Sequence, residues 1–466
     1  MLLENTRHID DAAVAPTIVN VIGSGAPINT APTPAGFAEL GLAAPLLHAL
    51  VKAGYTTPTP IQAQAIPTLL TGRDLLGIAQ TGTGKTAAFA LPILHRMAAR
   101  RARPARNTAR CLVLSPTREL AGQIADNFRT YGAGMGFIVS TVFGGVGYAG
   151  QIRALGAGVD VLVATPGRLI DHIKAGHLKL GSTEFFVLDE VDQMLDLGFL
   201  QPIRSIARDL PADRQNLFFS ATLPAEIGKL ASELLRDPVQ ISVTPVATTA
   251  AKVTQHAIVT EASNKRRLLL ELFADPAIVR AIVFTRTKRG ADKVAGMLDD
   301  AGVRTEPIHG NKSQGQRERA LRAFRDGGAR ALVATDIAAR GIDVDGVTHV
   351  INFEMPDEPE RYVHRIGRTA RAGAEGIAIA LVAPDELGAL RQVEKLTRQS
   401  IALRDRRDHV SVPLEQLVPI PGEGRSKRGR SRSGGGTRPD SRIVVKPFGG
   451  HPASKVAGKA RRQSRR

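Results

Sequence analysis

A chain of 466 residues with 43% hydrophobic content is long enough for two or three cores, so a single-core protein is not expected. Its apolar runs are far shorter than the ~20 residues of a membrane-spanning helix, and charged residues precede them at the N-terminus, so neither a membrane span nor export is expected. The single cysteine excludes a disulfide framework and fits a reducing cytoplasm, and the net charge of +18 favours polyanionic partners.

The first part of the chain is interpreted as a leader followed by one α/β domain. Residues 1–35 are rich in Ala, Pro, Thr and Gly without helical or strand periodicity, which indicates a disordered leader. Over residues 36–243, short apolar runs alternate with helix-length amphipathic stretches, the pattern of a doubly wound parallel sheet. We expect strands at residues 74–79, 111–114, 159–164, 185–188 and 217–219.

A second series of apolar runs predicts a second α/β domain over residues 253–403. Small residues at 244–252 indicate a linker between the two domains. In the second domain we expect strands at residues 281–285, 331–335, 349–353 and 377–382, and a helix at 385–400. The sequence thus predicts two tandem doubly wound parallel-sheet domains.

The basic tail, residues 404–466, differs in composition from both domains. From Glu423 to the C-terminus, 14 Lys/Arg residues stand against two acidic residues, so this stretch carries +12 of the total charge. Its Ser, Gly and Arg content predicts disorder, and dense Lys/Arg patches displace counterions from phosphates. We expect the tail to add affinity for nucleic acid; a solubilising tail without a partner is the alternative.

A phosphate-binding loop is indicated where the first expected strand ends. The residues Gln80-Thr81-Gly82-Thr83-Gly84-Lys85-Thr86 lie between this strand and a helix with one apolar face. Glycines let backbone N–H groups face phosphate oxygens, Lys85 reaches the outer phosphates, and the Thr86 hydroxyl binds Mg²⁺. The expected nucleotide-binding residues are Thr81, Gly82, Thr83, Gly84, Lys85 and Thr86.

Acidic residues follow the expected strand at 185–188, at the edge where open α/β sheets bind their ligands. Within Asp189-Glu190-Val191-Asp192, we expect Asp189 to bind Mg²⁺ and Glu190 to orient and polarise the attacking water. A solvated acidic turn is the alternative. The phosphate loop upstream favours the Mg²⁺ interpretation.

The second domain repeats the strand pattern without a phosphate loop, so we expect it to complete the nucleotide site of the first. The segment from His364 to Arg371 places Arg368 and Arg371 three residues apart, so both would face one target if the segment is helical. We expect these two arginines to stabilise charge on the γ-phosphate. Surface arginines in salt bridges are the alternative.

The order of these motifs along the chain resembles that of DEAD-box RNA helicases, and the resemblance runs from Phe37 to about Ser400. The bacterial RhlE-type branch of the family looks closest. Further matching segments lie at residues 54–62, 116–120, 144–145, 165–168, 220–222, 334–336 and 340–343. The resemblance implies two RecA-like domains, the cofactors ATP and Mg²⁺, and RNA as the nucleic-acid partner.

The resemblance also assigns roles beyond the phosphate loop. Gln62 would read the adenine edge and Phe37 would stack on the ring, so ATP should be preferred over GTP. Asp343 resembles the residue that meets the ribose. The positions that match the coupling of hydrolysis to unwinding are Ser220, Thr222, Asp192 and His364.

The family pattern assigns ten residues to RNA, mostly hydroxyl, glycine and arginine types that suit sugar and phosphate contacts and carry no base code. They are Thr117, Arg118, Gly145, Thr165 and Arg168 in the first domain, and Arg286, Gly310, Gln316, Arg319 and Thr335 in the second. For each, a loop residue that satisfies backbone groups is the alternative. We therefore expect sequence-independent RNA binding.

Two positions depart from the family pattern: Val191 stands where Ala is usual, and Ala370 stands where Gly is commoner. Neither change removes a charged group, but Val191 adds bulk beside the expected metal site and predicts small packing adjustments.

The resulting hypothesis is an ATP-dependent RNA helicase whose domains close on single-stranded RNA, separate a short duplex and reopen after hydrolysis. Because ATP and RNA would both favour closure, RNA should stimulate hydrolysis. An ATP-gated RNA clamp or ribonucleoprotein assembly scaffold is the first alternative, and a DNA translocase is the second. Partners in RNA degradation or ribosome assembly are left open by the sequence.

Overall fold

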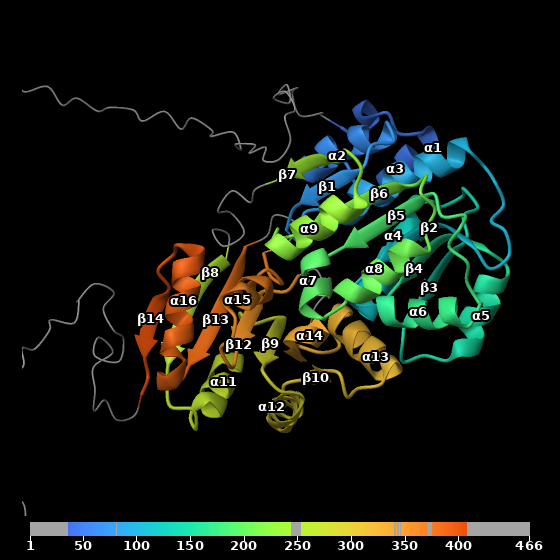
Figure 1. Ribbon diagram of the computed structural model, residues 1–466. Helices are drawn as coiled ribbons and strands as arrows, with labels where there is room; N and C mark the ends of the chain where they lie inside the picture. Colours follow the sequence, from blue (N-terminus) through green and yellow to red (C-terminus); the bar gives the residue numbers. More distant parts are fainter. Residues whose placement is uncertain are drawn as a thin grey trace, which may run out of the picture. The chain divides into compact units, whose positions relative to one another are not determined.

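The computed structural model describes residues 36–80, 82–243, 253–339, 342, 344, 346–370 and 375–407 (Figure 1). The predicted leader, the predicted linker and nearly all of the predicted tail lie outside the described residues, as do Thr81, Asp343 and Arg371. We call residues 36–243 the first lobe and residues 253–407 the second lobe. Across these ranges, no helix has the length and apolar character needed to cross a membrane.

The first lobe is built on a parallel sheet of seven strands in the order β3-β4-β2-β5-β6-β1-β7. Its strands are β1 (Leu75–Ile78), β2 (Ala109–Leu114), β3 (Val139–Val142), β4 (Val159–Ala164), β5 (Phe185–Asp189), β6 (Gln215–Ser220) and β7 (Val239–Ser242). The central strands β2, β4, β5 and β6 are buried along their whole length, which explains their continuous apolar runs.

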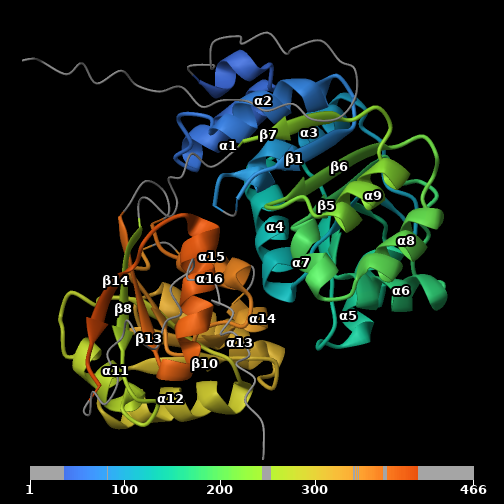
Figure 2. The same ribbon diagram turned by 60° about the vertical axis from the view of Figure 1, so that its left-hand side comes forward.

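Helices cover both faces of the first sheet, as Figures 1 and 2 show. They are η1 (Phe37–Leu40), α1 (Ala44–Lys52), α2 (Pro60–Leu70), α3 (Lys85–Ala99), α4 (Arg118–Tyr131), α5 (Tyr148–Gly156), α6 (Pro166–Lys174), α7 (Val191–Asp196), α8 (Leu200–Arg208) and α9 (Ala225–Leu234). Residues of α2, α3 and α4 form one core with the sheet, and residues of α6 to α9 form another. The layers are therefore helix, sheet and helix.

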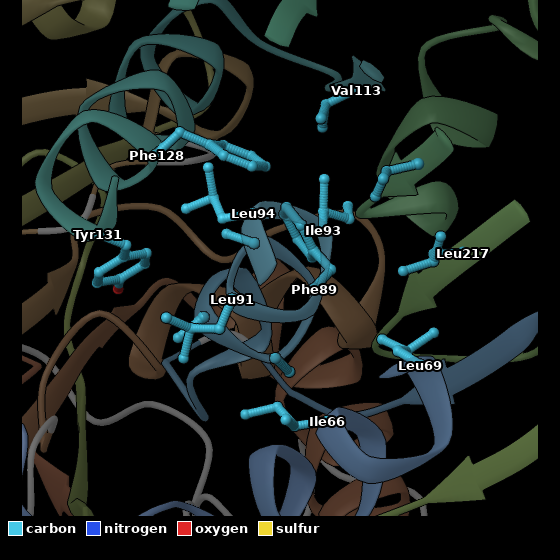
Figure 3. Close-up of a cluster of buried hydrophobic side chains, with 14 of the residues drawn as sticks. Ile66, Leu69, Phe89, Leu91, Ile93, Leu94, Val113, Phe128, Tyr131 and Leu217 are labelled. Carbon is cyan, nitrogen blue, oxygen red and sulfur yellow. The ribbon is translucent and has the colours of Figure 1, made fainter. Parts of the chain in front are cut away.

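The core beneath α3 holds the helix that follows the phosphate loop. Phe89 packs against Phe128 of α4 and Phe219 of β6, with ring centroids 6.1 and 5.4 Å apart. Figure 3 shows Phe89, Leu91 and Leu94 of α3 among side chains of α2, α4 and the sheet. This packing fixes the start of α3 relative to the strand that precedes it.

The second lobe repeats the arrangement, with a parallel sheet of seven strands in the order β10-β11-β9-β12-β13-β8-β14. Its strands are β8 (Val253–Val259), β9 (Ala281–Thr285), β10 (Thr305–Ile308), β11 (Ala331–Thr335), β12 (His349–Asn352), β13 (Gly376–Val382) and β14 (Ala402–Asp405). Its helices are α11 (Lys265–Phe273), α12 (Lys288–Asp300), α13 (Gln314–Arg325), α14 (Asp336–Ala339), α15 (Pro359–Ile366), η2 (Pro384–Glu386) and α16 (Leu387–Thr397). Helices α11 and α12 pack on one face and α13 to α16 on the other.

The predicted fold class, two tandem doubly wound parallel sheets, is confirmed for the described residues. The expected strands at 159–164, 281–285 and 331–335 coincide with β4, β9 and β11. The expected helix at 385–400 is observed as η2 followed by α16. The exact domain boundaries stay predictions.

Candidate nucleotide and RNA sites

The phosphate loop connects β1 to α3 and requires glycine at its last position. Gly84 caps α3 with a φ of 90°, a left-handed conformation that L side chains rarely adopt. A Cβ atom at this position would lie 2.2 Å from Nε2 of Gln62. Gly82 also has a positive φ, of 81°, and the Thr83 hydroxyl donates to the Gln80 carbonyl at 2.7 Å. The described loop residues therefore take the conformation that a phosphate cradle requires.

Lys85 begins α3 and is a buried cation at the mouth of this loop. The residue is 6% exposed, and within the described part of the chain its Nζ has no hydrogen-bond partner. An unpaired buried ammonium is unfavourable unless an anion joins it. The loop and Lys85 together therefore fit the phosphates of a nucleotide.

Asp189 and Glu190 lie at the carboxyl end of β5, and both carboxyl groups interact electrostatically with the Lys85 ammonium. Burial raises the pKa of the Asp189 carboxyl, and the Lys85 ammonium opposes this shift. Burial likewise raises the pKa of Glu190 to about 7, against the same opposing charge. Glu190 has a φ of 54°, and its Oε2 is buried with no partner among the described residues. Strained backbone conformations and carboxyl groups with raised pKa values concentrate at functional sites.

Asp192 links the acidic segment to the strand end at residues 220–222. Its Oδ2 accepts from the backbone N–H groups of Ala221 and Thr222, each at 3.1 Å, and from the Thr222 hydroxyl at 3.2 Å. The Ser220 hydroxyl accepts from the Asp192 N–H at 3.3 Å. The structure thus brings together three of the four residues expected to couple hydrolysis to unwinding.

The two residues expected to bind adenine are both almost completely buried. The Oε1 atom of Gln62 accepts from Thr59 N–H at 2.9 Å, and its Nε2 donates to the Gly84 carbonyl at 3.0 Å. Since an amide has two donors and a carbonyl with two lone pairs, one donor and one acceptor position remain for a base edge. Phe37 is 5% exposed and belongs to the core of the first lobe. Its expected stacking on the adenine ring stays a prediction.

The donor set at the phosphate loop suits Mg²⁺. Within the described ranges, no group of three or more His, Cys, Asp or Glu side chains is arranged to hold a metal ion by itself. Mg²⁺ usually takes one or two protein oxygens and completes its shell with water and substrate phosphates. Thr86 in the first turn of α3 and the buried Asp189 at the end of β5 supply oxygens of this type.

Residues expected to contact RNA in the first lobe cluster at the carboxyl ends of β2, β3 and β4. A Cβ atom on Gly145, whose φ is 80°, would lie 2.0 Å from the Arg118 guanidinium, so these two residues are in contact. Arg168 donates to the Val146 carbonyl at 3.1 Å and lies 4.2 Å above the Tyr148 ring. Thr117 caps α4 through the Leu120 N–H, and Thr165 precedes α6. Thr117 thus makes the local cap that was the alternative to an RNA role.

Three of the five second-lobe residues expected to contact RNA lie at strand ends. Arg286 follows β9, Gly310 follows β10, and Thr335 ends β11. Gln316 and Arg319 are exposed on α13, where Gln316 forms a capping box with Ser313. Gly310, Gln316, Arg319 and Arg286 are exposed, as phosphate contacts require, whereas Thr335 is buried.

Within the described residues, the segment from His364 to Arg371 is helical only at its start. Helix α15 ends at Ile366, so Arg368 lies beyond it, and the argument that placed Arg368 and Arg371 on one helical face does not apply. Arg368 donates to the carbonyls of Ile342 and His364 at 3.0 and 3.3 Å. Phe284, Asp336, Ala339, Arg361, His364, Arg365 and Arg368 line one small pocket of the second lobe. Whether Arg368 reaches a γ-phosphate stays a prediction.

Arg365 was not expected to have a role, yet its side chain donates four hydrogen bonds. Its guanidinium donates to both carboxylate oxygens of Asp336, at 2.5 and 2.8 Å, to Asn352 Oδ1 at 2.9 Å and to the Glu354 carbonyl at 2.7 Å. The residue is 2% exposed. Its place before the two arginines expected at the γ-phosphate gave no signal that it would join the ends of β11 and β12 to α15.

Comparison with known proteins matches both lobes to helicase families. Residues 59–230 match the DEAD/DEAH box helicase family, and residues 264–373 match the helicase conserved C-terminal domain. A DEAD-box ATP-dependent RNA helicase CshA from Geobacillus kaustophilus is 43% identical over 365 residues, which cover 78% of this chain and 77% of that protein. The protein of the same name from Bacillus subtilis is 40% identical over 365 residues, with 78% and 73% covered.

Two groups of solved structures resemble the fold. S. cerevisiae Dbp5 bound to RNA and ADP BeF3 aligns with a TM-score of 0.72 and 29% identity, covering 80% of this chain and 96% of that chain. The DEAD-box helicase Mss116 bound to ssRNA and UDP-BeF aligns with a TM-score of 0.72 and 25% identity, covering 82% and 80%. The two sheets of this chain therefore have the RecA-like fold.

Proposed function

Because this chain belongs to the DEAD-box ATP-dependent RNA helicases, we propose that its first lobe hydrolyses ATP at the Lys85 site and that both lobes grip single-stranded RNA. The enzyme is an RNA-stimulated ATP hydrolase that separates short duplexes. The observation that carries the proposal is the buried Lys85 ammonium, which lacks a partner in the described chain and faces two buried carboxyl groups.

In the proposed mechanism, the described loop residues hold the triphosphate through backbone N–H groups, and Lys85 neutralises its outer charge. Thr86 and Asp189 would hold Mg²⁺, which supplies charge neutralisation of the phosphate oxygens when bound. Glu190 accepts a proton from the attacking water and orients it. Arg368 and Arg371 stabilise the charge that develops on the γ-phosphate. Gln62 and Phe37 select adenine, and Asp343 holds the ribose.

Asp192 supports the coupling of hydrolysis to unwinding in this proposal. Its carboxylate accepts three hydrogen bonds from Ala221 and Thr222, and its backbone N–H donates to Ser220, so a shift of one segment is transmitted to the other. His364 is the proposed partner on the second lobe. Since ATP and RNA each favour the closed arrangement, each should tighten the binding of the other.

The function is tested by measuring steady-state ATP hydrolysis with and without saturating single-stranded RNA, and strand displacement on a short RNA duplex. We expect RNA to raise the hydrolysis rate and the duplex to be released only with ATP. Hydrolysis unchanged by RNA contradicts the coupling. Tight ATP-dependent RNA binding without strand release identifies a clamp, and equal stimulation by DNA of the same length favours a DNA translocase.

The basic tail is proposed to add sequence-independent affinity for RNA. Its +12 charge supports this role through counterion release from phosphates. A chain truncated after about Glu423 should bind RNA more weakly and with a flatter salt dependence, at unchanged ATP affinity. Equal salt slopes for the two chains contradict the proposal.

Three finer assignments remain proposals. The RhlE-type branch rests on the order of the motifs, whereas the relatives described above bear the name CshA. A cytoplasmic location rests on the single cysteine, Cys111, which fits a reducing compartment. Partners in ribonucleoprotein assembly, RNA degradation or ribosome assembly are best sought among RNAs and proteins crosslinked to the chain in cells.

A further inference from the structure

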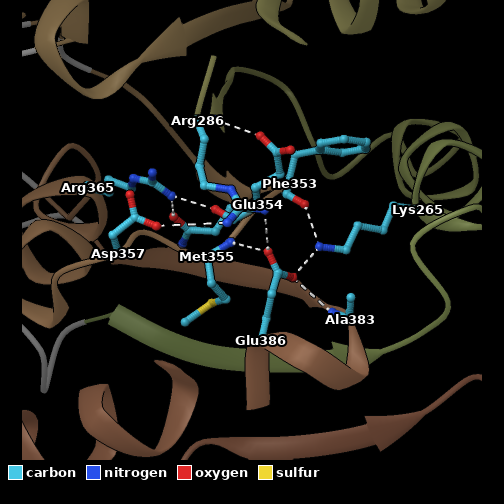
Figure 4. A network of polar contacts seen from close by, with 10 residues as sticks. Lys265, Arg286, Phe353, Glu354, Met355, Asp357, Arg365, Ala383 and Glu386 are labelled. Carbon is cyan, nitrogen blue, oxygen red and sulfur yellow. Dashed lines mark hydrogen bonds and ion pairs between the residues drawn. The ribbon is translucent and has the colours of Figure 1, made fainter. Parts of the chain in front are cut away.

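The second lobe contains a buried ion pair that no motif of the sequence predicted. Lys265, the first residue of α11, donates from Nζ to the Glu386 carboxylate and to the Phe353 carbonyl at 3.1 Å. The two charged side chains are 5% and 6% exposed. Figure 4 shows both beside the loop at residues 353–357, which follows β12. Such a pair is costly to desolvate, so its retention calls for a specific role.

Glu386 ties together three segments of the second lobe. Its Oε2 atom accepts from the Ala383 N–H at 2.9 Å, and its Oε1 atom accepts from the Met355 N–H at 3.2 Å. The same Oε1 atom lies 3.6 Å from the guanidinium of Arg286, which follows β9. The buried carboxylate therefore connects the ends of β9, β12 and β13.

Arg286 is held in place on several sides, yet its side chain is 43% exposed. Its backbone N–H donates to Glu354 Oε2 at 2.7 Å, and Asp357 lies 3.8 Å from its guanidinium. The contacts with Asp357 and Glu386 are longer than hydrogen bonds, so they orient the guanidinium without using up its N–H donors. Lys265 offsets the charge of Glu386, which leaves Arg286 attractive to a phosphate.

We propose that Glu386, balanced by Lys265, is a positioning residue that aims Arg286 at an RNA phosphate. The inference rests on the proposed function, in which Arg286 contacts RNA. An arginine already oriented in the RNA-free protein loses less side-chain entropy when a phosphate arrives. Removal of the buried negative charge lets the Arg286 side chain spread over other rotamers.

The test uses the full chain and a labelled single-stranded oligouridylate, with Mg²⁺ and a non-hydrolysable ATP analogue. Fluorescence anisotropy gives the RNA dissociation constant for wild type, Glu386→Gln, Arg286→Ala and the double variant. We expect Glu386→Gln to raise the dissociation constant about 3- to 10-fold, the range for a weakened charge-assisted contact. In the Arg286→Ala background the same substitution should have no further effect, because its target is gone.

Glu394→Gln is the matched control on the neighbouring helix. Glu394 also accepts a backbone N–H, from Ile401 at 2.9 Å, and pairs with an arginine, Arg391, at 2.7 Å. It should leave RNA binding unchanged. If Glu386→Gln does not fold, Lys265→Gln with Glu386→Gln removes both buried charges together and still deprives Arg286 of its carboxylate.

Three results overturn the inference. The first is an unchanged RNA dissociation constant in the folded Glu386 variants. The second is an equal loss of affinity with and without Arg286, which is the signature of a general structural defect. Arg286→Ala that binds RNA like wild type also overturns it, but ATP-dependent RNA binding by wild type then leaves the proposed function standing.

Discussion

The two lobes place a buried lysine at the same position and surround it differently. In each sheet order, β1 and β8 occupy equivalent places, between β6 and β7 and between β13 and β14. Each strand leads into a helix whose first residue is lysine, Lys85 in α3 and Lys265 in α11. In the described structure Lys85 has no hydrogen-bond partner, whereas Lys265 is paired with Glu386.

The connecting loops explain the difference. Residues 79–84 contain two glycines in left-handed conformation, so backbone N–H groups can turn toward an anion. Residues 260–264 contain no glycine, and an internal carboxylate satisfies the lysine that follows. A buried lysine after a strand is therefore no nucleotide site by itself; what matters is whether the protein supplies the anion.

The largest effect is expected when the paired lysine is replaced. Lys265→Met leaves the buried Glu386 charge with only its long contact to the half-exposed Arg286, so the free energy of unfolding should fall by about 3–5 kcal/mol. Denaturant unfolding, with hydrogen exchange of second-lobe peptides, measures the loss. The double change Lys265→Met with Glu386→Leu should recover most of it. Wild-type stability of the single variant would show that the pair is not structurally required.

Replacement of the unpaired lysine should affect catalysis and not folding. Lys85→Met removes the cation that neutralises the outer phosphates, so kcat/KM for RNA-stimulated ATP hydrolysis should fall by about 10²–10³-fold. Without nucleotide, its unfolding free energy should stay close to that of wild type, because the removal of an ammonium with no hydrogen-bond partner offsets the lost attraction to Asp189 and Glu190. A stability loss as large as that of Lys265→Met would erase the contrast between the lobes.

The buried acidic residue near Lys85 predicts a pH dependence of ATP hydrolysis. Burial raises the pKa of Glu190 to about 7, so the carboxylate that orients water is protonated below that pH and ionised above it. In the pH–rate profile, kcat/KM should fall about tenfold per pH unit below that value. Glu190→Gln should abolish this limb together with most activity. A limb centred near the ordinary glutamate pKa of 4.5 would contradict the burial argument.

The smallest effect concerns a left-handed position that the second lobe fills with alanine. Ala370 has a φ of 55°, whereas the positive-φ positions of the phosphate loop are glycines. Ala370→Gly relieves this strain and should raise the unfolding free energy by about 0.5–1 kcal/mol. Ala389→Gly, inside α16, should lower it by a similar amount. Thermal unfolding of both variants checks the opposite signs.

Sequence patterns predicted the interior of each sheet better than its edges. Five strands were not predicted. Four of them, β3, β7, β10 and β14, are the edge strands, and their side chains are mostly half-buried or exposed, whereas the fifth, β8, lies inside the second sheet. Edge strands need no continuous apolar run, so their composition resembles that of loops. β10 even contains Pro307, which a central strand would not tolerate. The strand expected at residues 377–382 matches β13 except for its first residue, Gly376.

The sites show a similar division between local and long-range information. The phosphate loop and the acidic segment are continuous in sequence, so their residues could be named before the fold was known. Lys265 and Glu386 are separated by 121 positions, and only the adjacency of β8, β13 and the loop after β12 brings them together. No strand was expected at residues 253–259, so the position of Lys265 after β8 carried no recognisable signal. The left-handed φ of Ala370 also gives a physical reason for the family's preference for glycine there.

Cys111, the single cysteine, lies within β2 and is fully buried. Burial raises the pKa of its thiol, so the reactive thiolate is scarce in the native protein. Maleimide dyes should therefore not label Cys111 in the folded protein. Cysteines introduced at Val51 and Val279, which are 75% and 64% exposed, place one fluorophore on each lobe. Energy transfer between them would follow domain opening and closing through a single turnover, without removal of the natural thiol.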